Sequence, residues 1–236
     1  MKKDIILLGL AREGSQRLEN KMLRSFGNTT LFDIYVDKLE KIANMKDSPF
    51  SKVVLALSPK DKRLWKIAKE KCKKTIIEVR SDFSVKEATK PSDLFHYLSR
   101  YKEDYVVRVN GCFPFLTPET IISATKHFIK HPELKTMTCV KERSNWFWNP
   151  ETNKPITLVD TSFTTTQQSK TMYESVHAFH ILNRKNILNN ILWNLKENDP
   201  HLYVVSDSIE FLDIDTETEF QICEAVWKVY EKLWKR

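Results

Sequence analysis

The sequence predicts an α/β protein in which a mostly parallel sheet lies between two layers of helices. Along most of the 236 residues, short apolar runs alternate with segments in which apolar residues recur every three or four positions. Parallel strands need long crossover connections, and helices in those connections cover both faces of the sheet. A chain of this length is sufficient for one such domain. The expected strands span residues 4–10, 53–58, 75–79, 105–110 and 135–140.

Three helices are expected within this alternation, and each has a recognisable beginning. A polar residue that can cap the first turn, or a proline at the first helical position, precedes each apolar period. The beginnings are Thr30 with Asp33, Ser58-Pro59-Lys60-Asp61 and Thr117-Pro118, and the helices extend to about residues 42, 72 and 131.

A fourth helix at the end of the chain has the clearest pattern. Thr216 caps it, and Glu219 follows three residues later. Its apolar side chains form a stripe that packs on the sheet or, alternatively, forms a seam between two copies of the chain. The stripe consists of Phe220, Cys223, Trp227, Tyr230 and Trp234.

The alternation breaks down over residues 141–175. This stretch contains Trp146-Phe147-Trp148, two prolines and a run of threonine and glutamine. It is too long for an ordinary connection, so a lid, an arm or a small subdomain is expected there. Residues 1–236 are therefore expected to form a single domain with this one insertion.

Composition restricts the class of protein. Thirty-eight Lys and Arg against 31 Asp and Glu give a net charge of +7, which fits a lysine-rich solubilising surface or a polyanionic substrate such as a nucleoside triphosphate. No basic run of five residues and no RNA-binding aromatic pattern occurs, so nucleic-acid binding is not expected. Four cysteines without paired spacing, no apolar run of bilayer length and no signal-peptide pattern predict a cytoplasmic protein with reduced thiols and no membrane association.

A basic turn follows the first expected strand. Four cations, Arg12, Arg17, Lys21 and Arg24, surround the flexible pair Gly14-Ser15. Cations and backbone N–H groups at the end of a strand are suited to cradle phosphate. On spacing alone, a solvated loop in which Glu13 and Glu19 pair with these cations is an equal alternative. The four glycines of the chain form neither the dinucleotide-binding motif nor the P-loop, so a phosphate site here depends on side-chain cations.

Near the carboxyl end, Asp213 and Asp215 precede the last helix. Residues two apart on an extended segment point to the same side, so the two carboxylates would face one ligand. Carboxylate oxygens beside a triphosphate suit Mg²⁺. The alternative is that Asp215 only favours the entry to the helix and that Asp213 is simply exposed.

A third segment, residues 108–115, leaves the fourth expected strand through Gly111. The carboxyl ends of strands are where open α/β sheets bind ligands, so Asn110 and the Gly111 backbone would face a substrate. The alternative is a turn anchored by Phe113 and Phe115. The histidine spacings do not support a metal site, and nothing in the sequence indicates that Cys112 is activated.

Together these segments resemble the cytidylyltransferase superfamily that activates acidic sugars, which includes acylneuraminate, KDO and spore-coat-type enzymes. Residues 11–21, A-R-E-G-S-Q-R-L-E-N-K, are similar to the family motif A-R-x-G-S-x-R-L-P-x-K. Residues 108–119, R-V-N-G-C-F-P-F-L-T-P-E, resemble the spore-coat-type R-[IV]-T-G-D-C-P-L-x-D-P-E. Residues 213–219, D-I-D-T-E-T-E, resemble the sialate-type D-I-D-T-x-x-[DE]. The order and separation of the motifs fit across nearly the whole chain.

The resemblance implies a nucleotide-diphospho-sugar transferase-like, Rossmann-like fold and a homodimer in which an arm of one subunit, here residues 141–175, reaches the sugar site of the other. It implies CTP as substrate and Mg²⁺, or Mn²⁺ in its place, as cofactor. The implied CTP contacts are Ala11, Arg12, Gly14, Ser15, Arg17, Lys21 and Asn110. The implied catalytic residues are Arg12, Lys21 and Asp215, the metal ligands Asp213 and Asp215, and the acceptor contacts Asn110 and His180.

Three departures from the family pattern affect these expectations. Glu19 stands where the family commonly has proline, and Cys112 stands where one branch has a metal-binding aspartate. Residues 176–180 read V-H-A-F-H where sialate enzymes have N-G-x-[IV]-Y, which leaves the sugar specificity open. His180 takes the tyrosine position, where it either faces the acceptor or packs in the core.

The expected reaction is transfer of CMP from CTP to a hydroxyl of an acidic, nonulosonic or sialic acid-like sugar, with release of pyrophosphate. One alternative is a transferase that uses another nucleotide or a non-sugar acceptor. Another is a non-catalytic nucleotide-binding homologue, suggested by Cys112 and residues 176–180.

Overall fold

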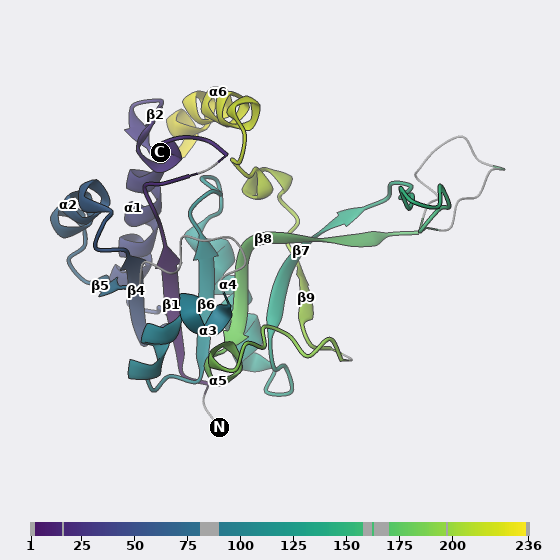
Figure 1. Ribbon diagram of the computed structural model, residues 1–236, viewed down its shortest axis with the longest axis horizontal. Coiled ribbons are helices and arrows are strands. Elements are labelled where there is room, and N and C mark those ends of the chain that lie inside the picture. Colours follow the sequence, from purple (N-terminus) through teal and green to yellow (C-terminus); the bar gives the residue numbers. More distant parts are fainter. Residues whose placement is uncertain are drawn as a thin grey trace.

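The computed structural model describes residues 3–15, 17–80, 90–157, 162, 170–196 and 198–234. Within them, seven strands form one sheet in the order β5-β4-β1-β6-β8-β7-β9 (Figure 1). Strands β5, β4, β1 and β6 are parallel, β8 is antiparallel to β6 and β7, and β9 is parallel to β7. The expected mostly parallel sheet is confirmed. The strands are β1 Ile5–Leu10, β4 Lys52–Leu57, β5 Ile76–Val79, β6 Tyr105–Asn110, β7 Met137–Arg143, β8 Met172–Asn183 and β9 His201–Val204; β2 Ser25–Phe26 and β3 Thr29–Thr30 form a separate hairpin.

Helices cover both faces of this sheet, which confirms three layers. Ile5 and Leu7 of β1 pack in a core with the long helices, whereas Ile6 and Leu8 pack with the short helices on the opposite face. The long helices are α1 Leu31–Asn44, α2 Lys62–Lys71, α4 Pro118–Lys130 and α6 Glu217–Trp234. The short helices on that opposite face are α3 Pro91–Leu94, α5 Arg184–Leu188 and η3 His96–Arg100. Two other short helices, η1 Lys21–Leu23 and η5 Ser208–Phe211, pack with the long helices through Met22 and Phe211. In the described parts of the chain, no helix is long and apolar enough to cross a membrane.

Four of the five expected strands agree with the structure to within one residue at each end. The fifth, expected over 135–140, begins at Met137 and continues to Arg143 because it pairs with β8 along that length. The sequence pattern does not predict β9, a four-residue strand at the edge of the sheet, or the short helices α3 and α5. Elements this short contain too few residues to establish a period.

The helix beginnings agree with the expected caps in three of four cases. Thr30 Oγ1 accepts a hydrogen bond from the N–H of Asp33 at 3.1 Å, and Thr117 caps α4 in the same way. The prediction that Ser58 caps α2 is wrong. Asp61 accepts hydrogen bonds from the N–H groups of Ser58 and Glu13, so residues 58–61 form a turn tied to the basic turn, and α2 begins at Lys62.

The last helix packs within the chain. The Thr216 hydroxyl accepts from the Glu219 N–H, and the Glu219 carboxylate accepts from the Thr216 N–H, which confirms the capping box. Phe220 and Trp227 are buried against Phe26, with ring centroids 5.4 and 5.8 Å away. The stripe as far as Tyr230 therefore packs against the core of its own chain.

Residues 141–175 correspond to a long extension. Strands β7 and β8 remain paired beyond the sheet, with Arg143 opposite Met172, and the ribbon projects away from the body (Figure 1). We call residues 141–175 the arm. Of this stretch, residues 158–161 and 163–169 lie outside the described residues.

Candidate active site

A cavity of about 700 Å³ opens at the carboxyl ends of β1 and β6. Neighbouring parallel strands end at the same edge of a sheet, and open α/β sheets bind ligands there. Three segments that are far apart in the sequence meet at this cavity: the basic turn, the loop after β6 and the acidic pair. The expected site residues that line it are Ala11, Arg12, Ser15, Arg17, Lys21, Asn110, Asp213 and Asp215.

Lys21 joins the basic turn to the acidic pair. Its Nζ lies 3.0 Å from Asp215 Oδ1 and donates a hydrogen bond to the carbonyl of Ile214. The other Asp215 oxygen lies 2.7 Å from Nη1 of Arg17. Burial opposes the charge of Lys21, but Cys112 and Asp215 outweigh it and raise the pKa of Lys21. Lys21 is therefore a permanent, fixed cation at the floor of the cavity.

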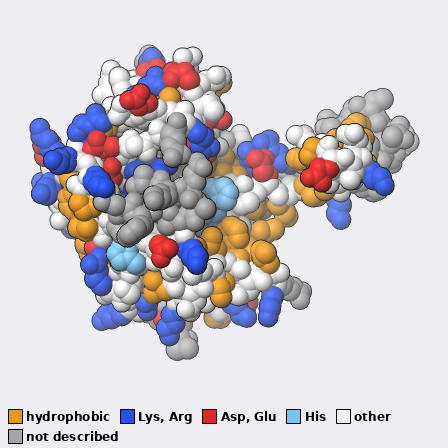
Figure 2. All heavy atoms as spheres, in the orientation of Figure 1, with side chains coloured by type: hydrophobic (Ala, Val, Ile, Leu, Met, Phe, Trp, Pro, Cys, Tyr) orange, Lys and Arg blue, Asp and Glu red, His pale blue; other side chains and the backbone are white. Residues whose placement is uncertain are grey.

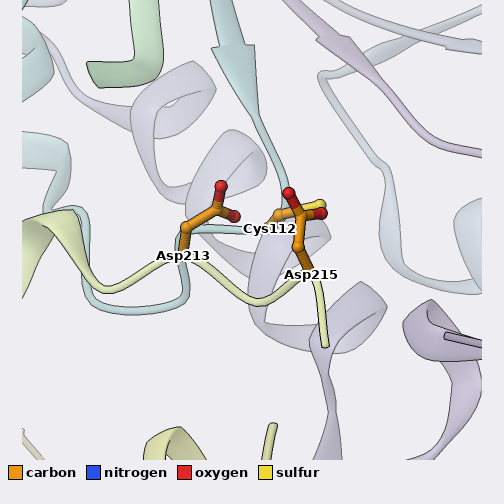
Figure 3. A group of neighbouring side chains, drawn as sticks. All are labelled: Cys112, Asp213 and Asp215. Atoms are coloured by element: carbon orange, nitrogen blue, oxygen red, sulfur yellow. The ribbon is translucent and has the colours of Figure 1, made fainter. Parts of the chain in front are cut away.

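Asp213, in contrast, has a carboxylate that no lysine or arginine of the described chain pairs with. It accepts a hydrogen bond from the N–H of Ile214 at 2.8 Å. Burial and the neighbouring Asp215 raise the pKa of Asp213 to about 6. Figure 3 shows the carboxylates of Asp213 and Asp215 beside the thiol of Cys112, and their ligand atoms all lie within 4.8 Å of one another.

These side chains fit a divalent cation. A half-buried carboxylate beside a second carboxylate, with no ion pair of its own in the described chain, is stabilised when a cation binds, and carboxylate oxygens are the ligands that Mg²⁺ prefers. Burial raises the pKa of the Cys112 thiol and so favours its protonated form, which is a poor ligand. Asp215 has both oxygens in ion pairs, so a cation that binds Asp215 replaces or shares one of them.

Close packing fixes the loop after β6. A Cβ atom on Gly111 would lie 2.8 Å from Cδ1 of Tyr35 and 3.1 Å from Cε of Met22, so a larger residue would push the loop away from α1. Asn110 Oδ1 accepts a hydrogen bond from the N–H of Cys112, whose carbonyl accepts from the N–H of Ile214. This chain of backbone contacts connects the loop directly to the acidic pair.

Glu13 of the basic turn pairs with a residue outside that turn. The Glu13 carboxylate accepts from the N–H of Arg63 at 2.7 Å and contacts the Arg63 guanidinium, so it lies at the beginning of α2. Arg12, Ser15, Arg17 and Lys21 line the cavity beside it. Glu13 therefore pairs with Arg63, whereas Arg17 and Lys21 pair with Asp215.

Two expected site residues do not line the cavity: Gly14 and His180. His180 is 4% exposed; its Nδ1 is 2.9 Å from Thr138 Oγ1 and its Nε2 is 3.2 Å from Nδ1 of His177. Burial, Arg108 and His177 lower the pKa of His180 to about 3, so the imidazole is neutral. His180 is a core histidine that supports His177, and His177 is the one that lines the cavity.

Sequence reasoning missed several lining residues, among them Arg80, Leu94, Arg108 and His177. Arg108 carried a usable signal, because it is a charged residue in an otherwise apolar strand. Arg80 and Leu94 belong to the ends of elements that only the tertiary structure brings to this edge.

The fold is shared with several solved structures. The chain superposes on CMP:2-keto-3-deoxy-manno-octonic acid synthetase complexed with CTP with a TM-score of 0.68 at 11% identity, covering 97% of this chain and 100% of that one. The superposition on 4-diphosphocytidyl-2C-methyl-D-erythritol synthase from Anaerococcus prevotii has a TM-score of 0.66 at 13% identity and covers 97% of this chain and 100% of that one. The superposition on Rv0371C of Mycobacterium tuberculosis H37Rv in complex with manganese has a TM-score of 0.56 at 16% identity and covers 94% of this chain and 99% of that one. No curated protein matches the sequence.

The family itself follows from the sequence match. The family model described as cytidylyltransferase matches residues 5–231, which include all three motifs and the segments that form the cavity. The chain belongs to the cytidylyltransferase family and is thereby a CTP-dependent nucleotidyltransferase.

Proposed function

We propose that this protein transfers CMP from CTP to a hydroxyl group of an acidic sugar and releases pyrophosphate, with Mg²⁺ or Mn²⁺ held by Asp213 and Asp215. The observation that carries the proposal is the meeting of the basic turn and the acidic pair, joined by Lys21, at one cavity. A cavity with cations on one side and carboxylates on the other is suited to a nucleoside triphosphate and its divalent cation.

In the proposed reaction, the oxygen of the acceptor hydroxyl attacks the α-phosphorus of CTP. A new phosphorus–oxygen bond forms, the bond between the α-phosphorus and the bridging oxygen breaks, pyrophosphate leaves with the electron pair, and the hydroxyl proton passes to solvent. The protein contributes alignment and charge rather than covalent chemistry. A bound divalent cation supplies positive charge beside the transferring phosphate.

The residues of the cavity divide this work. Lys21 and Arg12 offset the negative charge that grows on pyrophosphate, and Lys21 is preorganised because Asp215 and the Ile214 carbonyl fix its Nζ. Ser15 and Arg17 bind phosphate oxygens, and the backbone of Ala11 approaches the nucleotide. Asn110 contacts the base or the acceptor.

The manganese complex of a fold relative supports divalent-cation chemistry in this fold, and the CTP complex of another supports CTP as its ligand. The printed names of the relatives include one acidic sugar acid and one methylerythritol derivative, so the acidic acceptor is the part of the proposal that depends on experiment.

The test is pyrophosphate release with CTP, Mg²⁺ and a panel of sugar acids. Asp215→Asn and Arg12→Ala should each lower kcat/KM by about 10²-fold or more and leave the fold intact, because each removes a charge that acts on the transferring phosphates. Asp47→Asn, at an exposed residue outside the cavity, is the matched control. Near-normal turnover by folded Asp215→Asn would overturn the metal and charge assignment.

Nucleotide binding and pyrophosphate release, measured together, separate the alternatives. Thermal shifts with CTP, UTP, GTP and ATP measure binding, and the largest stabilisation is expected with CTP. If the protein binds CTP and releases no pyrophosphate with any acceptor, it is a non-catalytic homologue. If turnover requires a non-sugar acceptor, the acceptor class is different from the one proposed.

A further inference from the structure

Arg108 occupies an unusual position for a charged residue. It lies in β6, which pairs with β1 on one side and with β8 on the other. The residues opposite Arg108 are Leu8 of β1 and His180 of β8. Its guanidinium lies 5.9 Å from the centre of the Phe95 ring, and the residue lines the cavity. Arg108 is half-buried, and this burial lowers the pKa of Arg108.

The cations of the cavity differ in whether the chain gives them an oxygen partner. Arg17 and Lys21 pair with Asp215, and Arg80 donates a hydrogen bond to the carbonyl of Ala11 at 2.9 Å. Within the described chain, no carboxylate, carbonyl or hydroxyl accepts a hydrogen bond from the guanidinium of Arg108. A guanidinium has five N–H donors, and burying it without acceptors is unfavourable.

A second donor beside Arg108 is also without an acceptor. The hydroxyl of Tyr97 in η3 is buried and makes no hydrogen bond in the described chain, and Tyr97 is close enough to Arg108 for the two to interact electrostatically. His177 lines the cavity and makes its hydrogen bond to His180, whose position in β8 is opposite Arg108. Among the described residues, Arg108, Tyr97 and His177 thus place donors at this point, and no carboxylate accepts a hydrogen bond from them.

This part of the cavity is separate from the place where the triphosphate would bind. The sheet order β1-β6-β8 places the basic turn, which follows β1, on one side of β6 and His177 of β8 on the other. The acidic pair contacts Lys21 of the basic turn. An anion that reaches Arg108 and His177 is thus suited to be a group of the second substrate.

We propose that Arg108, with His177 beside it, binds the anionic group of the acceptor, a carboxylate or a phosphate. This inference rests on the proposed function, and it names the residue that selects an acidic acceptor. The planar guanidinium can donate two parallel hydrogen bonds to two oxygens of either group, and this bidentate interaction is strong where water is excluded. The unfavourable burial of Arg108 is then offset when the acceptor binds.

The first measurement follows Arg108 in the wild-type protein. The enzyme is saturated with Mg²⁺ and a CTP analogue whose α,β-bridging oxygen is a methylene group, which fills the triphosphate site and prevents transfer. The side-chain Nε–Hε resonance of Arg108, assigned by its loss in Arg108→Met, is then titrated. N-acetylneuraminate is the carboxylate probe and glycerol 3-phosphate is the phosphate probe. A saturable shift with one of them supports the proposal and identifies the acid group.

The second measurement separates a binding role from a structural one. Arg108→Met should melt at the same or a higher temperature than wild type, because it removes a half-buried charge that has no oxygen partner in the described chain, and it should bind CTP normally. Its KM for the acceptor should rise by about 10- to 100-fold, with a smaller change in kcat. Arg100→Met, at an exposed arginine paired with Glu78, is the matched control and should leave KM unchanged.

The outcomes distinguish this inference from the proposed function. Turnover with an acceptor whose KM is the same in wild type and Arg108→Met would overturn the role of Arg108 and leave the transferase intact. An Arg108 resonance that neither probe shifts, in protein that binds the analogue, would also overturn it. Failure to bind CTP would overturn the proposed function. Arg108→Lys keeps the charge without the fork, and it supplies the kinetic comparison if the methionine variant does not fold.

Discussion

Lys38 is a completely buried lysine on α1 that holds the loop after β6. Its Nζ donates to the carbonyl of Phe113 at 3.0 Å and lies 3.5 Å from that of Pro114. Burial, only partly opposed by Glu210, lowers the pKa of Lys38 from an ordinary 10.5 to about 7. A neutral amine can still donate to these carbonyls, so Lys38 supports the loop that includes Cys112 without needing its charge.

This shift predicts a pH-dependent stability. Between pH 7 and 10.5 the unfolded chain binds more protons at Lys38 than the folded chain, so the free energy of unfolding contributed by Lys38 rises with pH in that window. The free energy of unfolding of wild type relative to Lys38→Met should therefore rise with pH in this window, by at most about 1.4 kcal/mol per pH unit. Urea unfolding of both proteins between pH 6.5 and 10 measures this difference in the free energy of unfolding. A difference that is independent of pH would contradict the assignment.

At the residue scale, the sequence could predict side chains whose chemistry is local. Arg12, Lys21 and the acidic pair were predicted because they belong to short contiguous motifs, and all four line the cavity. His177 and His180 could not be told apart, because an irregularity in the β7–β8 pairing near Val140 alters the simple alternation of side chains there. Which histidine faces the cavity depends on that irregularity.

At the scale of the element, two glycines of the β1 region have different roles. A Cβ atom on Gly9 would lie 2.7 Å from Leu39 Cδ1 and Tyr35 Oη, both of α1, whereas one on Gly14 would have no neighbour within 4 Å. Gly9 thus lets β1 and α1 pack closely. Gly14 is not required by packing.

These glycines give a matched pair of variants. Gly9→Ala should lower the free energy of unfolding by about 1–3 kcal/mol, because β1 and α1 must move apart. Gly14→Ala should change it by less than about 0.5 kcal/mol. Chemical denaturation measures both. Equal stability of the two variants would show that the packing at Gly9 relaxes without loss.

Helix caps were the elements that sequence predicted best. Thr30, Thr117 and Thr216 bond to backbone groups three residues away, so their signal is complete within one turn. Ser58 does not cap α2. Asp61 accepts the N–H of Ser58, as a capping acid would, but it also accepts the N–H of Glu13, 48 residues earlier in the chain, and residues 58–61 form a turn before α2 begins at Lys62. A helix beginning is predictable when its polar partners are local, and less so when a distant segment binds the same residues.

At the scale of the whole molecule, the arm is the feature that suggests assembly. Figure 2 shows hydrophobic side chains gathered beside the base of the arm, over the region of β7, β8 and β9. The exposed apolar residues in these strands include Tyr173, Leu202 and Val204. Exposed apolar surface of this kind is typical of a protein interface.

On the same face, Lys and Arg are spread among acids rather than gathered in one stripe.

The arm therefore leads to a prediction about mass in solution. We expect the intact protein to be a homodimer, with twice the chain mass of 27.8 kDa. Replacing residues 145–170 by a two-residue Asn-Gly turn keeps the β7–β8 pairing and should yield a folded monomer. Light scattering gives the mass, and circular dichroism checks the fold. An intact protein that is monomeric at high concentration, or a shortened one that is still dimeric, would contradict a role of the arm in assembly.

The sequence by itself determined the local features of this protein: the strand–helix alternation, three of the caps, the basic turn, the acidic pair and the membership of the family. The caps, the basic turn and the acidic pair each depend on residues within one element or one turn, and the alternation and the family match depend on the order of such segments along the chain. Only the tertiary structure decided that Lys21 joins Asp215 across 194 positions, that Arg108 lies in the cavity without an oxygen partner, and that His180 is buried behind His177. These are contacts between distant segments, and strand order, register and packing fix them rather than local propensity.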